Sequence, residues 1–201
     1  MDDLVEEVVP LRDGELVVLR PRDAEALIDE DAFEREEQMP YWAELWPSGV
    51  ALARAVSGVS LGGRRVLELG CGGLALPSIA AALSGARVLA TDWAPDALAL
   101  AEENAARNGT SISTAVVAWE SPESVLEHEW DLVLAADVIY ERRNVETLLG
   151  LLPRLGRRTW LADPGRAFSE EFLERAASAF TVESRQDPVA SAVSVHRLTR
   201  R

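Results

Sequence analysis

The sequence contains no lysine, because all 20 of its basic side chains are arginines. This absence excludes a P-loop lysine, a lysine that forms a Schiff base with pyridoxal phosphate, and the Tyr–Lys pair of short-chain dehydrogenases. One cysteine and two histidines are too few for a disulfide framework or for a zinc site built only from protein ligands. A single cysteine is typical of a reducing compartment, so we expect a cytoplasmic protein with no metal site.

Long apolar runs are also missing. No window holds the ~18 uninterrupted apolar residues that a membrane-spanning helix needs, and the acidic residues 1–7 are unlike a signal or transit peptide. We therefore expect no membrane association. The net charge of −14 repels nucleic acid, so the sequence predicts no nucleic-acid partner.

The 201 residues, 48% of them hydrophobic, are enough for one domain with a sizeable core. Two β-like runs joined by Asp13-Gly14 predict an N-terminal hairpin over residues 4–20, because Asp-Gly favours a tight hairpin turn. Apolar periodicity then predicts helices and strands in alternation. The expected helices cover residues 47–56, 74–84, 95–108, 144–155 and 168–179; the expected strands cover 65–69, 87–91, 112–117, 130–137, 158–162, 180–185 and 192–198.

This alternation predicts an α/β fold with a parallel sheet and helices on both faces. The last two strands have no helix between them, which indicates an antiparallel hairpin at the C-terminus. We expect one domain over residues 1–201, divided into an N-terminal hairpin and helix extension (1–60) and a core (61–201).

The most informative stretch is VLELGCGG at residues 66–73, where a strand runs into glycines that open a helix. Glycines let the backbone approach a ligand, and the helix N-terminus offers free N–H groups. Asp92 ends the next strand, 22 positions after Gly70, where a carboxylate accepts hydrogen bonds from ribose hydroxyls. The pattern predicts a ligand that contains a nucleoside. The alternative is that the glycines only make a tight turn and Asp92 only caps the next helix.

Gly70-x-Gly72-x-x-Ala75 also fits the dinucleotide pattern. Glu68 argues against a dinucleotide, because a carboxylate beside the glycine loop repels a pyrophosphate and attracts an ammonium group. Only 109 residues follow Asp92, which is short for a separate substrate domain, and the lysine of one-domain reductases is absent.

The pattern Glu-x-Gly-x-Gly resembles the first motif of class I S-adenosylmethionine-dependent methyltransferases. That resemblance implies a Rossmann-like, doubly wound, seven-stranded sheet, mostly parallel with an antiparallel C-terminal strand. Three further blocks are similar to family 16 lysine methyltransferases and to the branch that modifies the electron-transfer flavoprotein β subunit, which also holds nicotinamide N-methyltransferase-like proteins. They are PYWAELWPSG (40–49), DVIY (137–140) and DPGR (163–166).

The resemblance implies S-adenosylmethionine as cofactor, S-adenosylhomocysteine as product, and an N-terminal extension that covers the cofactor. It assigns the ribose hydroxyls to Asp92 and places Trp46 over the cofactor. Trp93 is expected to stack on adenine unless it is a core residue, and Trp119 to line the adenine pocket. The predicted cofactor-binding set is Trp46, Glu68, Gly70, Cys71, Gly72, Asp92, Trp93, Trp119 and Ala136.

Asp137 and Tyr140 are the predicted catalytic pair. Asp137 ends a buried strand, where open α/β sheets bind ligands. A carboxylate there lowers the cost of holding sulfonium and ammonium cations and can take a proton through water, and Tyr140 can hydrogen-bond the amine. The alternative for Asp137 is a turn or capping residue. Arg166 either holds a substrate carboxylate or pairs with an acidic neighbour.

The expected reaction is N-methylation of a lysine on a protein substrate. Two alternatives stay open: methylation of a small amine or other metabolite, and a nucleotide-binding regulator without catalysis. An acidic run over residues 29–37 is expected to form a rim that steers a cationic acceptor. The oligomeric state does not follow from the sequence.

Overall fold

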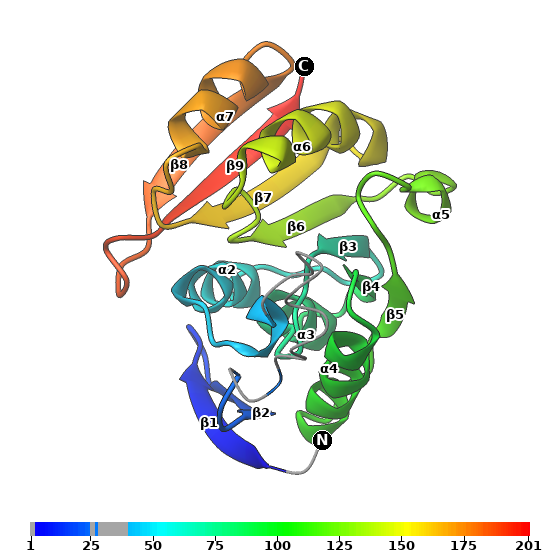
Figure 1. The fold of residues 1–201 in the computed structure, drawn as a ribbon, viewed down its shortest axis with the longest axis vertical. Coiled ribbons are helices and arrows are strands. Elements are labelled where there is room, and N and C mark those ends of the chain that lie inside the picture. The colour runs from blue at the N-terminus through cyan, green and yellow to red at the C-terminus, as the bar shows by residue number, and fades with distance from the viewer. Residues whose placement is uncertain (1–2, 25–26, 28–39) are drawn as a thin grey trace.

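A seven-stranded sheet forms the centre of the molecule (Figure 1). The computed structural model describes residues 3–24, 27 and 40–201. The strand order is β5-β4-β3-β6-β7-β9-β8, and all neighbours are parallel except those of β9. The strands are β3 (Arg65–Leu69), β4 (Arg87–Asp92), β5 (Ser113–Val116), β6 (Leu132–Ala136), β7 (Arg158–Asp163), β8 (Phe180–Gln186) and β9 (Ser194–Arg200). The predicted fold class is confirmed.

Helices cover both faces of this sheet. The helices are η2 (Tyr41–Ala43), α2 (Pro47–Ser57), α3 (Leu76–Leu83), α4 (Pro95–Arg107), α5 (Glu123–Leu126), α6 (Arg142–Leu155) and α7 (Ser169–Ala176). Leu52 and Ile79 from α2 and α3 belong to the core cluster on one face, and Leu148 and Phe172 from α6 and α7 belong to the cluster on the other. The strand order reverses between β3 and β6, because β4 and β5 follow on one side of β3 and β6 and β7 on the other. Open α/β sheets bind ligands at such a switch point.

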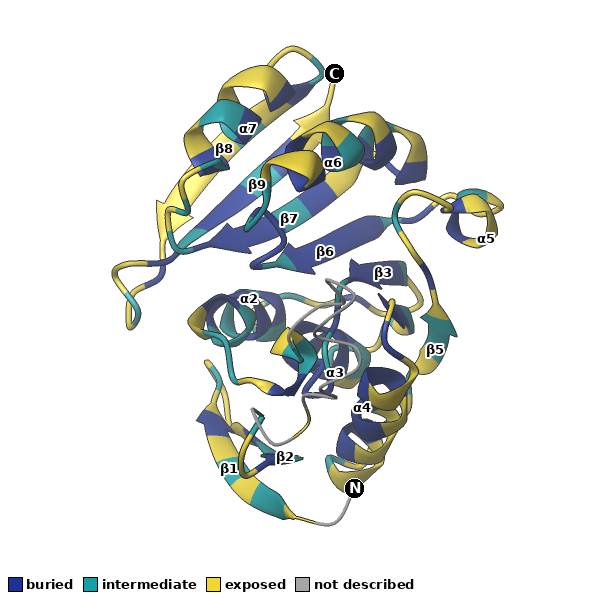
Figure 2. Cartoon of the chain, in the orientation of Figure 1, coloured by how far each residue is buried: buried dark blue, intermediate teal, exposed yellow. Residues whose placement is uncertain are grey.

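The two strands at the switch point are buried on both faces (Figure 2). Residues 132–135 of β6 and 66–69 of β3 are all buried, and the only polar side chain among them is Glu68. The sequence of a strand that is covered by helices on both faces is a nearly continuous apolar run. The apolar run near residue 130 is confirmed as a buried strand.

The N-terminal hairpin lies apart from the main sheet. Strands β1 (Leu4–Pro10) and β2 (Glu15–Pro21) pair antiparallel, and Gly14 has a φ of +94° at the predicted Asp-Gly turn. Leu16 and Val18 belong to the same core cluster as α2. The hairpin therefore packs its apolar face onto the core.

Three element ends differ from the predictions for backbone reasons. The helix predicted from residue 74 starts at Leu76, because Ala75 has left-handed dihedrals (φ +43°). The strand predicted over 130–137 is shorter at both ends: Trp130 forms only an isolated bridge to Gly156, and Asp137 turns the chain with a φ of +60°. Both left-handed residues lie at the switch-point end of the sheet.

A buried ion pair joins α2 to the loop between β8 and β9. Arg54 Nη1 lies 2.5 Å from Asp187 Oδ1, with side chains 11% and 3% exposed. The backbone N–H groups of Val189 and Ala190 donate to the same carboxylate oxygen. Although burial raises the pKa of Asp187, these hydrogen bonds and Arg54 bring it below its usual value. Within the described residues, no helix has the length and apolar character needed to cross a membrane.

Asp187→Ala is expected to lower the free energy of unfolding by ~3–5 kcal/mol, because it leaves Arg54 buried without its partner. The measurement is urea denaturation followed by circular dichroism. Asp3→Ala is the control, since the Asp3–Arg22 pair is exposed and contributes ~1 kcal/mol at most. Equal losses of unfolding free energy in the two variants would show that the Arg54–Asp187 pair stabilises the fold no more than an exposed ion pair does.

Candidate functional site

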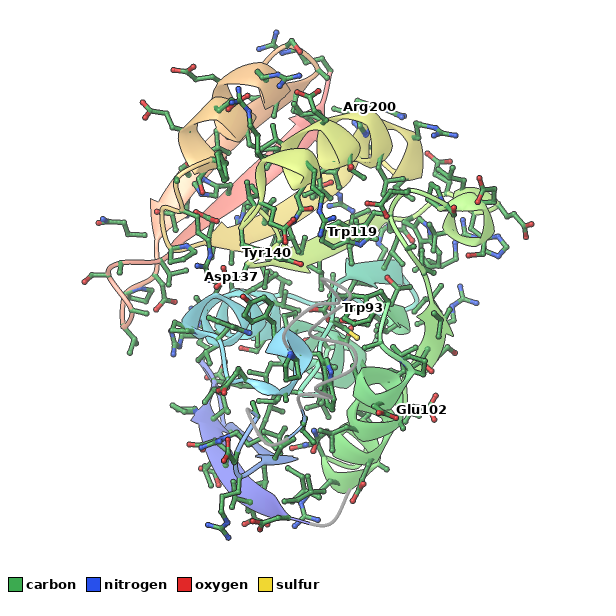
Figure 3. The ribbon with its side chains drawn as sticks, viewed as in Figure 1. Trp93, Glu102, Trp119, Asp137, Tyr140 and Arg200 are labelled. Atoms are coloured by element: carbon green, nitrogen blue, oxygen red, sulfur yellow. The ribbon has the colours of Figure 1, made fainter. Side chains whose placement is uncertain are left out.

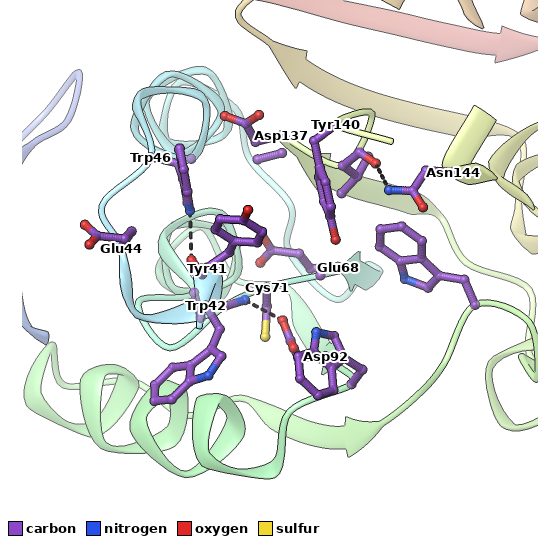
Figure 4. A pocket seen from close by; sticks show the side chains of 18 of the residues that line it. Tyr41, Trp42, Glu44, Trp46, Glu68, Cys71, Asp92, Asp137, Tyr140 and Asn144 are labelled. Atoms are coloured by element: carbon purple, nitrogen blue, oxygen red, sulfur yellow. Dashed lines mark hydrogen bonds between the residues drawn. The ribbon is translucent and has the colours of Figure 1, made fainter. Parts of the chain in front are cut away.

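One cavity of about 1100 Å³ opens at the carboxyl ends of β3, β4 and β6 (Figures 3 and 4). Every residue of the predicted cofactor-binding and catalytic sets lines it: Trp46, Glu68, Gly70, Cys71, Gly72, Asp92, Trp93, Trp119, Ala136, Asp137 and Tyr140. The structure therefore brings together residues that are up to 94 positions apart in the sequence. Their individual roles stay predictions.

The glycine loop needs its glycines. Gly70 and Gly72 have φ values of +67° and +60°, which L side chains rarely adopt. A Cβ on Gly70 would lie 3.2 Å from the Trp119 ring, and one on Gly72 would lie 3.1 Å from the Trp42 carbonyl oxygen. The loop backbone thus packs against the Trp119 ring at Gly70 and against the Trp42 backbone at Gly72, with no room for a side chain at either glycine.

Glu68 lies beneath this loop. It is 1% exposed, and its Oε2 accepts hydrogen bonds from Ser78 N (2.9 Å) and Ser78 Oγ (2.5 Å) in α3. Burial raises the pKa of Glu68 to about 8, the nearby Asp92 raises it further, and the Ser78 hydrogen bonds oppose the rise. Glu68 is therefore largely protonated at neutral pH in the free protein, whereas the sequence suggested an ionised carboxylate ready for an ammonium group.

Asp92 joins the ends of β3 and β4. Its Oδ2 accepts from Gly72 N (2.9 Å), and its Oδ1 accepts from Ala94 N (3.0 Å) ahead of α4. The side chain is 6% exposed, and burial raises its pKa although the backbone hydrogen bonds oppose the rise. Asp92 thus fixes the turn, as the capping alternative supposed, and also faces the cavity, as ribose binding requires.

The other cofactor-side residues differ in exposure. The Cys71 side chain is buried, so burial raises the pKa of its thiol, and the Cys71 N–H donates to Thr91 O (2.9 Å). Trp93 is 47% exposed, which excludes the core interpretation for that residue. Trp119 is half-buried against Gly70. Trp93 and Trp119 thus each offer an aromatic ring to the cavity.

Asp137 stands at the other end of the cavity. It is 8% exposed, Ser48 Oγ donates to its Oδ2 (3.2 Å), and Arg166 Nε donates to its Oδ1 (2.5 Å). Arg166 therefore pairs with an acidic neighbour, which is one of its two sequence interpretations. The Arg166 guanidinium also lies 5.4 Å from the centre of the Trp46 ring, within cation–π range.

Hydrogen bonds to Asp163 hold the loop that carries Arg166 in place. Asp163 is 1% exposed, and its Oδ1 accepts from the N–H groups of Gly165 (2.7 Å) and Arg166 (3.0 Å) and from Ser169 Oγ. The hydrogen bond to Asp137 raises the pKa of Arg166, even though partial burial lowers it. Arg166 is thus a permanent cation at this end of the cavity.

Aromatic side chains lie beside and below Asp137 in Figure 4: Trp46, Tyr41 and Tyr140. The Tyr41 ring lies edge-to-face with Trp46 (6.1 Å) and with Tyr140 (5.9 Å). Burial raises the pKa of Tyr140, and the charge of Glu141 raises it further, so its hydroxyl stays protonated near neutral pH. Tyr140 can therefore donate or accept a hydrogen bond but does not act as a phenolate base.

The lining or supporting residues that were not predicted include Tyr41, Ser48 and Asn144. Asn144 Nδ2 donates to Val138 O (2.9 Å) and so fixes the 137–140 segment against α6. Tyr41 and Ser48 belong to the 40–49 block, which was the available signal, while Asn144 carried none. The acidic run 29–37 lies outside the described residues. Among the described residues, no cluster of His, Cys, Asp and Glu could hold a metal ion.

The strand order and the glycine loop at the switch point define the class I methyltransferase fold. A ribosomal protein L11 methylase from Lactobacillus delbrueckii superposes with a TM-score of 0.59 at 22% identity, covering 77% of this chain and 79% of that one. A 16S rRNA methyltransferase from T. thermophilus gives 0.69 at 14% identity, covering 100% and 52%. These likenesses show the fold.

Residues 30–160 match the lysine methyltransferase family, and the chain belongs to that family. The electron transfer flavoprotein beta subunit lysine methyltransferase of Danio rerio is 36% identical over 143 residues, 66% of this chain and 53% of the relative. The ribosomal protein L11 methyltransferase of Edwardsiella ictaluri is 28% identical over 153 residues, 76% and 50%. The chain spans about half the length of the curated relatives it matches, and the resemblance seen in its motifs is confirmed.

Glu68→Gln is expected to remove part of the pH dependence of stability. The folded chain holds the Glu68 proton up to about pH 8, because its pKa is raised to about 8, and the unfolded chain releases it near the ordinary glutamate pKa of 4.5. The unfolded state therefore binds fewer protons within this window, so rising pH destabilises the wild type, by ~1.4 kcal/mol per unit at most.

Urea midpoints at pH 5.5 and 8.5 measure this effect. The wild type is expected to lose more stability between the two than Glu68→Gln, while Glu103→Gln, at an exposed position, behaves as the wild type. The same loss in wild type and Glu68→Gln would contradict the raised pKa.

Proposed function

We propose that this chain is an S-adenosylmethionine-dependent methyltransferase that methylates a lysine side chain of a partner protein. The observation that carries the proposal is the single cavity, which joins the glycine loop and Asp92 at one end to the Asp137–Arg166 pair at the other. Membership of the lysine methyltransferase family supports it, as do relatives named for methylating two proteins, the flavoprotein β subunit and L11.

The cofactor end fits S-adenosylmethionine on its own geometry. Gly70 and Gly72 line the cavity with positive φ values and no side chains, and a backbone surface of this kind suits a ligand that must approach closely. Asp92 faces the cavity for the ribose, and Trp93 and Trp119 offer rings for the base. Glu68 and Asp92 have raised pKa values because they are buried, so a cationic ligand would favour their ionised forms.

The bound cofactor supplies a methyl group already activated on a sulfonium, so the protein has mainly to align and deprotonate the acceptor amine. Asp137 lies where it can hold the amine, and Arg166 and Ser48 fix the direction of its carboxylate. Tyr140, with its protonated hydroxyl, is suited to hydrogen-bond the nitrogen. The Asp137 carboxylate is suited to accept the proton that the acceptor ammonium loses and to release it to water.

The charge around the cavity favours a cationic acceptor. Two arginines, Arg143 and Arg166, line it, whereas the lining carboxylates number six: Glu44, Glu68, Asp92, Glu120, Asp137 and Glu141. The charge of the whole chain is −14. Such a field steers a lysine-bearing surface toward the site and weakens with salt. The absence of a nucleic-acid partner and the cytoplasmic location stay predictions from composition.

S-adenosylhomocysteine is expected to bind in calorimetric titration, and NAD is not. Asp92→Ala should weaken S-adenosylhomocysteine binding by ~1.5–3 kcal/mol, because a largely buried ribose loses a charge-assisted partner. Asp96→Ala is the matched control, since Asp96 is exposed in the first turn of α4. Binding of NAD without S-adenosylhomocysteine would overturn the proposal, and an unaffected Asp92→Ala would leave Asp92 as a turn residue only.

Asp137→Asn is expected to keep S-adenosylhomocysteine affinity within about threefold and to cut turnover at least ~100-fold, because it faces the acceptor. The assay follows methyl label from the cofactor into protein fractions of the source cells, at low and high salt, with Tyr140→Phe alongside. The chain has no lysine, so any labelled lysine belongs to a partner. Label only in small molecules would favour the metabolite alternative, and no label would favour the regulator.

A further inference from the structure

The β1–β2 hairpin pairs with a helix as if the helix were a third strand. β2 has β1 on one edge, and the backbone of Val17 and Leu19 on its other edge bonds to two asparagines of the α4 segment. Asn108 Oδ1 accepts from Val17 N (3.0 Å) and its Nδ2 donates to Val17 O (2.9 Å). Asn104 does the same with Leu19 (2.6 and 2.9 Å).

The geometry of the two elements explains this pairing. A carboxamide carries a donor and an acceptor in one plane, as a peptide group does. Residues four apart on a helix rise about 6.0 Å, and residues two apart on a strand advance about 6.6–6.8 Å. Asn104 and Asn108 therefore match Val17 and Leu19 closely enough to satisfy four edge groups that would otherwise need water.

The third bond of each asparagine differs. Asn108 Nδ2 donates to Asn104 O inside α4 (2.8 Å), whereas Asn104 Nδ2 donates to Gly73 O of the glycine loop (2.9 Å). Asn104 is 0% exposed, and its hydrogen bond to Gly73 O is buried and so shielded from water. Asn104 thus connects the N-terminal hairpin directly to the loop that borders the cavity.

Hydrogen bonds to several other segments of the chain hold the glycine loop in place. Gly73 N donates to Trp42 O (2.8 Å), Gly72 N donates to Asp92 (2.9 Å), and Cys71 N donates to Thr91 O (2.9 Å). Asn104 adds a hydrogen bond from α4 to this loop, and that bond acts on the Gly73 carbonyl. Fixing that carbonyl fixes the peptide plane that follows Gly73, and with it the entry into α3.

We infer that Asn104 is a positioning residue for the cofactor-binding loop and makes the β1–β2 hairpin part of the cofactor site. This inference rests on the proposed function for the identity of the ligand. Asn104 does not touch the cavity and acts through Gly73. Because coupling is reciprocal, a ligand that orders the loop also protects β2 from exchange with solvent.

The test compares Asn104→Ala with Asn108→Ala. Each substitution removes three hydrogen bonds, two of them to β2, and the two differ in whether the third partner is the glycine loop or α4. The expected result for S-adenosylhomocysteine is a Kd at least tenfold weaker in Asn104→Ala and within twofold of wild type in Asn108→Ala. Circular dichroism confirms that both are folded, and Asn104→Asp with Asn108→Asp serves as the second pair if either alanine variant is not.

Amide hydrogen exchange of the ligand-free proteins gives an independent readout. The peptide over residues 70–75 is expected to exchange faster in Asn104→Ala than in wild type, and at the wild-type rate in Asn108→Ala. Equal exchange of this peptide in the two variants, or an unchanged Kd in Asn104→Ala, overturns the role of Asn104. A wild type that binds no S-adenosylhomocysteine overturns the proposed function instead, and the exchange comparison then decides the role of Asn104 alone.

Discussion

The hydrogen bond from Gly72 N to Asp92 is the contact on which the site depends. It joins the loop after β3 to the end of β4, so the positions at which these two neighbouring strands leave the sheet are fixed relative to each other. With the loop fixed, Gly70 and Gly72 keep their positive φ values, and the backbone becomes one wall of the cavity. Every other feature of the cofactor end is arranged around that wall.

Three buried carboxylates face one cavity, and only one of them has a counterion. Asp137 is paired with Arg166, whereas burial raises the pKa values of Glu68 and Asp92. Unpaired buried acids cost stability, and the cost falls when a cation enters. S-adenosylmethionine carries a sulfonium and an ammonium, so under the proposed function the ligand itself supplies the positive charge that Glu68 and Asp92 lack.

The sequence predicted what depends on local pattern. Alternating apolar runs predicted the strands, and the spacing from Gly70 to Asp92 predicted which strand ends meet. It did not predict contacts between distant side chains: Ser48 and Arg166 reach Asp137 from 89 and 29 positions away, and Asn104 reaches Leu19 from 85. Those contacts depend on how the elements pack, and the residue type of a serine or an asparagine does not indicate which distant group it will hydrogen-bond. The left-handed Ala75 was missed because nothing in its residue type favours that conformation.

The asparagine pairing has a further consequence, for self-association. A two-stranded sheet ordinarily offers two open edges, each a template onto which another chain can add a strand. In this protein α4 occupies the β2 edge through Asn104 and Asn108, which leaves β1 as the other edge of the hairpin within the part of the chain that the structure describes. β1 carries Glu6, Glu7 and Pro10, and charge and proline both discourage strand addition. The hairpin is thus protected against aggregation on one edge by a helix and on the other by its own sequence.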